Sequence, residues 1–222
     1  MTAKKASSLP IYPHLDFEQH LWSAGILRVA GLDEAGRGAW AGPVCAAAVI
    51  LPPDKSIQKN LQGVRDSKQM TPNQRSAWAV KIREFALTCG VGFASNDEID
   101  RIGILPATRL AMQRALKLLN SQPQYLLLDY MLLRFYELPQ TSLVKGDRQS
   151  LSIAAASVLA KTSRDSLMIE LDSKYCGYGF ARHKGYGTRQ HRESLELHGV
   201  IEIHRHSFSP MKDMLNFEKV IH

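Results

Sequence analysis

Short apolar runs bounded by glycine or proline alternate along the chain with longer segments in which apolar residues recur at helical spacing. Continuous apolar runs of this length are typical of buried β-strands, and amphipathic spacing is typical of helices. Five runs are expected to form strands: 26–33, 43–51, 89–94, 125–129 and 142–145. Because helical segments lie between most of these runs, the pattern predicts an α/β domain with a mixed central sheet flanked by helices.

Start signals define where the helices begin. A threonine cap at Thr71, with Gln74 three residues later, predicts a helix over 71–87. Ser95 opens a second capping box, and Pro106 is expected to interrupt the helix that follows it. The other expected helices cover 151–174, 188–198 and 212–220.

The domain organisation follows from length and pattern. A chain of 222 residues fits one domain. Residues 1–24 carry no periodic pattern and are expected to be a flexible leader, followed by the main domain over 25–180. Residues 181–222 are expected to be a helical, basic extension of the same domain.

The composition is basic and ordinary for a globular protein. The sequence has 28 Lys and Arg against 21 Asp and Glu, a formal net charge of +7. This surplus favours a polyanionic partner such as nucleic acid, although a protein that is merely basic has the same composition. Three scattered cysteines indicate a reducing compartment and argue against a zinc ribbon. No signal peptide and no apolar stretch of about 20 residues is present, so we expect a cytoplasmic protein without membrane contact.

Acidic residues follow the ends of the predicted strands. Asp33 closes the first strand and Glu34 comes next, Asp129 closes the run 125–129, and Asp147 follows the last strand. Open α/β sheets gather their site residues at strand ends, so three or four carboxylates are expected to converge there. Carboxylate oxygens without histidine or cysteine partners select Mg²⁺ or Mn²⁺. The alternative is that each acidic residue only caps a helix or a turn.

A glycine-rich turn, Gly36-Arg37-Gly38, follows the first strand. It is not a dinucleotide-binding fingerprint, because Gly42 comes one residue late and a strand follows in place of a helix. Glycines beside an arginine allow backbone amides to approach a phosphate or a sugar closely. A simple connecting turn is the alternative.

The C-terminal part combines basic and aromatic residues. Tyr186 lies between two glycines in a cationic segment, where its ring could stack on a base or sugar while its neighbours contact phosphates. A solvated loop is the alternative. Six of the eight histidines lie beyond residue 182, and His204 and His206 are two residues apart. Without a cysteine pair we interpret them as isolated polar histidines and not as a zinc site.

These motifs closely resemble those of the ribonuclease HII family. The matching blocks occur in the family's order and are specific as a set: 31–38, 41–44, 46–49, 66–68, 145–147, 153–157, 160–161, 164–165 and 183–188. The resemblance implies a ribonuclease H-like fold. It also implies an endonuclease that cuts the RNA strand of RNA–DNA hybrids and nicks at ribonucleotides embedded in duplex DNA. Such an enzyme has to sense the 2′-hydroxyl, the group that distinguishes RNA from DNA.

The resemblance also assigns roles to individual residues. It implies metal-binding carboxylates at Asp33, Glu34, Asp129 and Asp147. It implies that the Gly36-Arg37-Gly38 turn contacts the ribose 2′-hydroxyl through backbone groups, and that Tyr186 stacks at the ribonucleotide–deoxyribonucleotide junction. Lys68 and Lys184 are expected to contact the substrate as well.

Two positions depart from the family pattern. Trp40 follows the glycine-rich turn where a small residue or proline is expected, and Tyr130 follows Asp129 where glycine is more usual. Either change is expected to affect access or substrate preference. The related ribonuclease HIII normally has a long N-terminal domain and lacks the Gly-Arg-Gly tripeptide, so ribonuclease HII is the better match.

We hypothesise hydrolysis with two Mg²⁺ or Mn²⁺ ions, giving 3′-hydroxyl and 5′-phosphate ends. One ion lowers the pKa of a bound water that attacks phosphorus, and the other neutralises the departing 3′-oxygen. A monomer is expected, and Phe217 leaves a weak sliding-clamp peptide open. The alternatives are a non-catalytic nucleic-acid-binding module, which would be free to lose a carboxylate, and a DNA nuclease of the same fold, which would have no use for the Gly-Arg-Gly turn.

Overall fold

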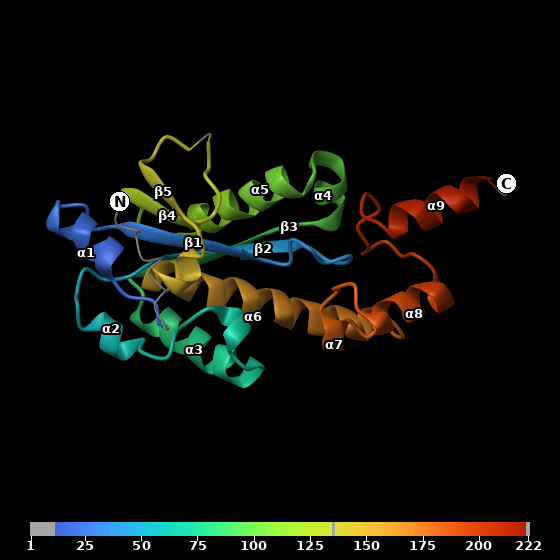
Figure 1. Cartoon of the computed structure of the whole chain (residues 1–222), viewed down its shortest axis with the longest axis horizontal. Helices are drawn as coiled ribbons and strands as arrows, with labels where there is room; N and C mark the ends of the chain where they lie inside the picture. Colours follow the sequence, from blue (N-terminus) through green and yellow to red (C-terminus); the bar gives the residue numbers. More distant parts are fainter. Residues whose placement is uncertain (1–11, 135, 221–222) are drawn as a thin grey trace, which may run out of the picture. The chain divides into compact units, whose positions relative to one another are not determined.

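The computed structural model describes residues 12–134 and 136–220, with side chains as far as residue 215 (Figure 1). The strands are β1 (Val29–Ala35), β2 (Val44–Ile50), β3 (Thr88–Ala94), β4 (Tyr125–Asp129) and β5 (Gln140–Leu143). The helices are α1 (Asp16–Ser23), α2 (Ile57–Asn60), α3 (Pro72–Phe85), α4 (Asn96–Ile102), α5 (Ile104–Lys117), α6 (Leu151–Lys174), α7 (Phe180–His183), α8 (Arg189–His198) and α9 (Met211–Val220). Two short 3-10 helices are η1 (Ser67–Gln69) and η2 (Gly146–Arg148).

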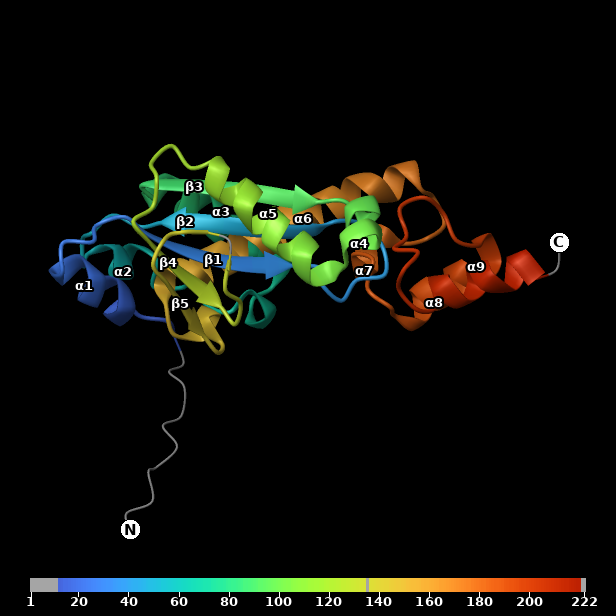
Figure 2. The ribbon, with the colours of Figure 1, turned by 90° about the horizontal axis from the view of Figure 1, so that it is seen from above.

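The strands form one five-stranded mixed sheet in the order β3-β2-β1-β4-β5. Figure 2 shows β4 between β1 and β5. Both neighbours run parallel to β4, with Leu32 opposite Leu128 and Asp129 opposite Leu143. The predicted α/β architecture with a mixed sheet flanked by helices is therefore confirmed.

The described residues form two compact units. Unit 1 contains the described part of Met1–Asp33 together with Val49–Thr88 and Ser121–Val158. Unit 2 contains Glu34–Ala48, Cys89–Asn120 and the described part of Leu159–His222. The domain boundaries expected at residues 24 and 180 are not tested by this division and stay predictions.

In unit 1, β1 and α6 approach each other closely at Gly31. A Cβ atom at this position would lie 2.2 Å from the carbonyl carbon of Ser152, a distance that real Cβ atoms do not show. Val29, Leu127 and Ile153 form a buried apolar cluster beside this contact. Glycine is thus required at Gly31 because the helix backbone occupies the space of a side chain.

One expectation is wrong in the N-terminal part of unit 1. Asp16–Ser23 form α1, although 1–24 was expected to be a flexible leader; residues 1–11 lie outside the described part of the chain. The carboxylate of Glu18, which is 0% exposed, accepts hydrogen bonds from the Ser150 hydroxyl and from the backbone N–H and hydroxyl of Ser152. No local pattern indicates this helix, because its anchor lies more than a hundred residues away in sequence.

The predicted helix starts are confirmed. The capping boxes at Thr71 and Ser95 are both formed. The helical segment that begins at Ser95 is interrupted as predicted, and the break lies at Gly103, whose φ of 82° is favourable for glycine. Pro106 lies in the first turn of α5, where a missing N–H costs no hydrogen bond.

Unit 2 has its own apolar cluster near the C-terminal end of α6. Its buried members are Ala41, Met168, Tyr178, Phe180, Leu195, Ile203 and Met211. None of the helices in the described ranges combines the length and the apolar character required to cross a lipid bilayer.

Candidate active site

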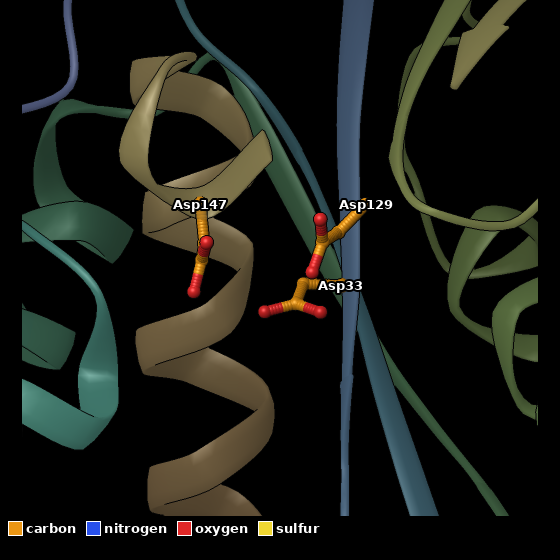
Figure 3. Close-up of side chains that lie close together, drawn as sticks. All are labelled: Asp33, Asp129 and Asp147. Carbon is orange, nitrogen blue, oxygen red and sulfur yellow. The ribbon is translucent and has the colours of Figure 1, made fainter. Parts of the chain in front are cut away.

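Three carboxylates from distant parts of the sequence converge in unit 1 (Figure 3). Asp33 lies on β1, Asp129 ends β4 and Asp147 lies in η2. One oxygen of each carboxylate lies within 4.8 Å of the others. The predicted convergence of carboxylates at strand ends is therefore present for these three residues.

The register of the parallel strands explains the meeting of the first two. Leu32 pairs with Leu128, so the next residue on each strand carries its carboxylate at the same edge of the sheet. The third carboxylate, that of Asp147, is positioned by a 2.7 Å hydrogen bond from the backbone N–H of Gly146 to Oδ1 of Asp129. Asp147 is the residue after this donor.

The electrostatics of the group favour a bound cation. Burial, together with the negative charges of Asp66 and Asp129 and against the positive charge of Lys68, raises the pKa of Asp147 to about 6. The pKa of Lys68 is also raised. Burial alone would lower it, but the negative charges of Asp33, Asp147 and two further carboxylates outweigh the effect of burial. The carboxylates thus hold more negative charge than their protein surroundings neutralise.

The donor chemistry fits a hard divalent cation. In the described residues, this is the one group of three or more acidic, histidine or cysteine side chains close enough to share an ion. All its donors are carboxylate oxygens, which suit Mg²⁺ or Mn²⁺ better than zinc. Asp33, Asp129 and Asp147 could therefore hold such an ion between them.

Glu34, the fourth predicted ligand, belongs to unit 2. Its carboxylate accepts a hydrogen bond from Arg37 at 3.1 Å and is mostly buried. This ion pair fixes the side chain of Arg37 against the start of the glycine-rich turn. A ligand role for Glu34 stays a prediction.

The glycine-rich turn is held by Arg205, a residue that sequence reasoning missed. The Arg205 guanidinium, 0% exposed, donates to the carbonyl oxygens of Gly36 and Arg37 at 2.7 Å each and of Gly42 at 3.0 Å. In the sequence Arg205 is one more cation in a basic tail. Its role could not be predicted because carbonyl acceptors leave no trace in a sequence.

A second buried arginine, Arg164, fixes neighbouring segments of unit 2. It donates to the carbonyl oxygens of Ala41, Pro43 and Lys184 at 3.1, 2.8 and 2.9 Å. A Cβ atom at Gly36 would lie 1.9 Å from its Nε, so the first glycine of the turn is required by this side chain. Gly38, in contrast, has open space where its Cβ would be.

Tyr186 lies in a tight loop between α7 and α8. Lys184 and Gly185 both have positive φ values, 54° and 79°, and turn the chain sharply before the Thr188 cap of α8. The Tyr186 ring is half-buried and lies 5.4 Å from the Arg164 guanidinium and 5.5 Å from Nζ of Lys161. The ammonium group of Lys184 donates to the carbonyl of Ala181, and its substrate contact stays a prediction.

The two departures from the family pattern have different surroundings. Trp40 packs in unit 2 against His191 and against Gly187, where a Cβ would lie 2.3 Å from the indole ring. Tyr130, in unit 1, is 70% exposed and has a φ of 60°. This left-handed conformation favours glycine, which explains why glycine would be the ordinary residue after Asp129.

The interpretation of the histidines as isolated polar residues is wrong for three of them. His183, His191 and His204 are buried and contact one another in unit 2. Their spacing in sequence gives no sign of this, because α7, α8 and the following loop each contribute one ring. His206 is exposed and does not belong to this group.

Comparison with known proteins agrees with this geometry. The family model of ribonuclease HII matches residues 30–211. The ribonuclease HII of Dehalococcoides mccartyi is 48% identical over 204 residues, which cover 90% of this chain and 94% of that protein. The chain belongs to the ribonuclease HII family.

Solved structures show the same fold. Ribonuclease H2 from Pyrococcus horikoshii OT3 has a TM-score of 0.71 at 26% identity, covering 86% of this chain and 99% of that one. Ribonuclease HII from Archaeoglobus fulgidus, solved as a complex with PCNA, has a TM-score of 0.70 at 25% identity, covering 82% and 96%. The expected ribonuclease H-like fold is confirmed.

Family membership defines the general activity. The protein is a metal-dependent endoribonuclease that acts on RNA–DNA hybrids, so its substrate is a nucleic acid and its cofactor a divalent metal ion. The alternative of a non-catalytic binding module is thereby excluded.

Proposed function

We propose that this enzyme cuts the RNA strand of RNA–DNA hybrids and also nicks duplex DNA on the 5′ side of an embedded ribonucleotide, leaving 3′-hydroxyl and 5′-phosphate ends. The observation that carries the proposal is the convergence of Asp33, Asp129 and Asp147 within 4.8 Å. Three carboxylates at this spacing suit phosphodiester hydrolysis assisted by divalent ions.

The proposed ligands are Asp33, Glu34, Asp129 and Asp147, holding two Mg²⁺ or Mn²⁺ ions in the active complex. When bound, such ions supply an activated water and neutralise charge at the departing 3′-oxygen. The chain's own contribution is to orient the ligands: Gly146 fixes one oxygen of Asp129, and burial fixes Asp33 and Asp147. Lys68, held beside these carboxylates by their charge, is proposed to bind a phosphate of the substrate.

Recognition of the ribose is proposed to use the Gly36-Arg37-Gly38 turn. Arg205 already donates to the carbonyl oxygens of Gly36 and Arg37, which favours the N–H groups of the turn as the groups that meet the substrate. An N–H donor pairs with the oxygen of a 2′-hydroxyl, which DNA lacks. Tyr186 is proposed to stack at the junction that follows the ribonucleotide.

The test uses a labelled DNA duplex with a single ribonucleotide and an all-DNA duplex as control, each with Mg²⁺ or Mn²⁺. We expect a metal-dependent nick 5′ to the ribonucleotide and none in the control. Equal cleavage of both duplexes would instead favour a DNA nuclease of the same fold. Cleavage of long hybrids without nicking of the single-ribonucleotide duplex would limit the activity to hybrids and direct attention to Trp40 and Tyr130.

Assembly and location stay predictions. We expect a monomer in the cytoplasm. A sliding-clamp contact is suggested by the Archaeoglobus fulgidus relative, which was solved with PCNA. The segment concerned here is 214–222, which contains no convincing clamp peptide beyond the weak version that Phe217 leaves open; the side chain of Phe217 lies outside the described part of the structure.

A further inference from the structure

Two buried histidines connect the loop of Tyr186 to the segment that precedes Arg205. His191 and His204 are both 0% exposed, and their Nε2 atoms lie 3.1 Å apart. Nδ1 of His191 lies 3.0 Å from the carbonyl oxygen of Tyr186, and Nδ1 of His204 lies 3.0 Å from the backbone nitrogen of Ile201. The contacts form one continuous chain from Ile201 to Tyr186.

For neutral rings, the carbonyl oxygen of Tyr186 determines where the hydrogens of this chain lie. A carbonyl oxygen only accepts, so Nδ1 of His191 carries a hydrogen and donates to Tyr186. Nε2 of a neutral His191 is then an acceptor, and Nε2 of His204 must carry the hydrogen between the two rings. Nδ1 of His204 lies 3.0 Å from the backbone nitrogen of Ile201 and 3.2 Å from its carbonyl oxygen, and with the hydrogen on Nε2 it accepts the N–H at the shorter of these two distances.

The third histidine has an equally defined state. Nε2 of His183 donates to the carbonyl of Tyr178 at 2.8 Å, and its Nδ1 accepts the N–H of Gly185 at 3.2 Å. Its ring stacks on that of His191, with the ring centroids 4.4 Å apart. Burial favours the neutral form of all three rings, and this arrangement of hydrogens is consistent with it.

In the loop held by these rings, the backbone polar groups of Lys184, Gly185 and Tyr186 are paired. The Lys184 N–H donates to the carbonyl oxygen of Phe180, and the Lys184 carbonyl oxygen accepts from the Arg164 guanidinium. The Gly185 carbonyl oxygen accepts from the backbone N–H of Trp40 at 2.7 Å. The Tyr186 N–H donates to the backbone carbonyl oxygen of His183 at 3.0 Å. The Tyr186 carbonyl oxygen accepts from the backbone N–H of Thr188 at 2.8 Å and from Nδ1 of His191. His191 thus bonds the backbone of Tyr186 through its side chain.

We propose that His191, oriented by His204, is a positioning residue for Tyr186 and sets how well the enzyme discriminates a ribonucleotide junction from plain DNA. The inference rests on the proposed role of Tyr186 in stacking at that junction. His204 determines which nitrogen of His191 carries the hydrogen. Because Nε2–H of His204 donates to Nε2 of His191, the hydrogen of a neutral His191 lies on Nδ1, which faces Tyr186. This His204–His191 relay is expected to act on substrate binding, because the group that it holds is the backbone of Tyr186.

Asparagine and glutamine substitutions test which ring nitrogen donates and which accepts, since their amide groups mimic different ring nitrogens. The asparagine amide can occupy the place of Nδ1, and the glutamine amide the place of Nε2. His191→Asn retains the donor to Tyr186, whereas His191→Gln loses it. At His204 the order reverses, because His204→Gln retains the donor to His191 and His204→Asn loses it.

We expect a crossed pattern in kinetics on the single-ribonucleotide duplex. His191→Gln and His204→Asn should raise KM roughly three- to tenfold, as the loss of one buried hydrogen bond implies, with kcat within about twofold of wild type. His191→Asn and His204→Gln should stay near the wild-type KM. Equal effects of Asn and Gln at each position, or KM values that follow melting temperature alone, would refute the relay.

A double variant separates positioning from general stability. If the relay acts through Tyr186, His191→Gln should raise KM no further in a Tyr186→Ala background; an unchanged additional loss there would overturn the inference. Failure of the proposed function is distinguishable, because it would appear in the wild type as equal cleavage of ribonucleotide-containing and all-DNA duplexes.

The proton assignment is also testable without any variant. In wild-type protein labelled with ¹⁵N-histidine, nuclear magnetic resonance at pH 7.5 should show hydrogen on Nδ1 of His191 and on Nε2 of His204. The opposite tautomer at either ring, or a doubly protonated ring, contradicts the relay even if every substituted protein misfolds.

Discussion

Gly146 donates its backbone N–H to Oδ1 of Asp129, and this 2.7 Å hydrogen bond joins the end of β4 to the short helix η2. Since Asp147 is the next residue, one contact sets the position of two of the three converging carboxylates. The geometry of the group therefore depends on the side chain of Asp129 in two ways, as a charge and as an acceptor.

Asp129→Asn separates these two properties. An asparagine oxygen still accepts the Gly146 N–H, so η2 and the fold should be retained, but the charge that attracts a divalent ion is lost. We expect turnover to fall by at least about 100-fold, since charge stabilisation by a bound ion contributes several kcal/mol to the barrier. Single-turnover cleavage at saturating Mg²⁺ measures this, and hybrid binding should be largely spared. Wild-type rates in this variant would contradict the assignment of Asp129.

Gly31→Ala should destabilise the fold by about 3 kcal/mol, because the added methyl group meets the backbone of Ser152 and overpacks the junction of β1 and α6. Chemical denaturation gives the free energy of unfolding. Gly38→Ala is the matched control, because its methyl group enters open space. Similar free energies of unfolding for the two variants would show that β1 and α6 can separate at little cost.

Glu18→Ala should lower the free energy of unfolding by about 2–4 kcal/mol. The substitution leaves the buried N–H of Ser152 and two serine hydroxyls without their acceptor. Glu193→Ala serves as a control, because its pairing with Arg189 is solvent-exposed and contributes little. Thermal and denaturant unfolding of both variants would decide, and an unchanged stability for Glu18→Ala would mean that α1 is not anchored by this carboxylate.

The buried histidines should make stability depend on pH. Burial lowers the pKa of His191 and of His204 to about 4, so between pH 6.5 and 4 the unfolded chain binds more protons than the folded one. Stability from these groups is fully present above pH 6.5 and is lost as the pH falls toward 4, by up to about 3 kcal/mol for each ring.

This prediction has a competing contribution of opposite sign. The pKa of Asp147 is raised to about 6, so its protonation favours the folded state as the pH falls through the same window. The unfolding free energy should therefore be compared between wild type and the double variant His191→Asn with His204→Gln, which retains Asp147. The wild type should lose more stability between pH 7 and pH 5 than the double variant, and parallel profiles would show that the rings are not buried in the neutral form.

What the sequence could predict was governed by the range of the interactions concerned. The helix starts at Thr71 and Ser95 were predictable because a capping box is complete within four residues. Asp33 and Asp129 were predictable because each ends an apolar run, and parallel neighbouring strands bring such ends together.

The missed features depend on partners far away in sequence. Glu18 bonds serines more than a hundred residues away, and Arg205 bonds carbonyl oxygens of a turn that precedes it by more than a hundred and sixty residues. Carbonyl groups occur at every residue, so nothing in the composition of the glycine-rich turn indicates which arginine will hold it. The histidine relay was missed for the same reason, since both of its ends contact backbone atoms.

The burial of Arg164 and Arg205 changes how the basic charge of this protein should be understood. Both count fully in the formal charge of +7, yet both are 0% exposed and are surrounded by carbonyl oxygens. Solvent ions cannot reach a buried guanidinium, so salt screens its field much less than that of a surface lysine. The attraction that these two arginines exert on a phosphate backbone releases no counterions of their own, and it should persist at ionic strengths where the contacts of exposed cations have been lost.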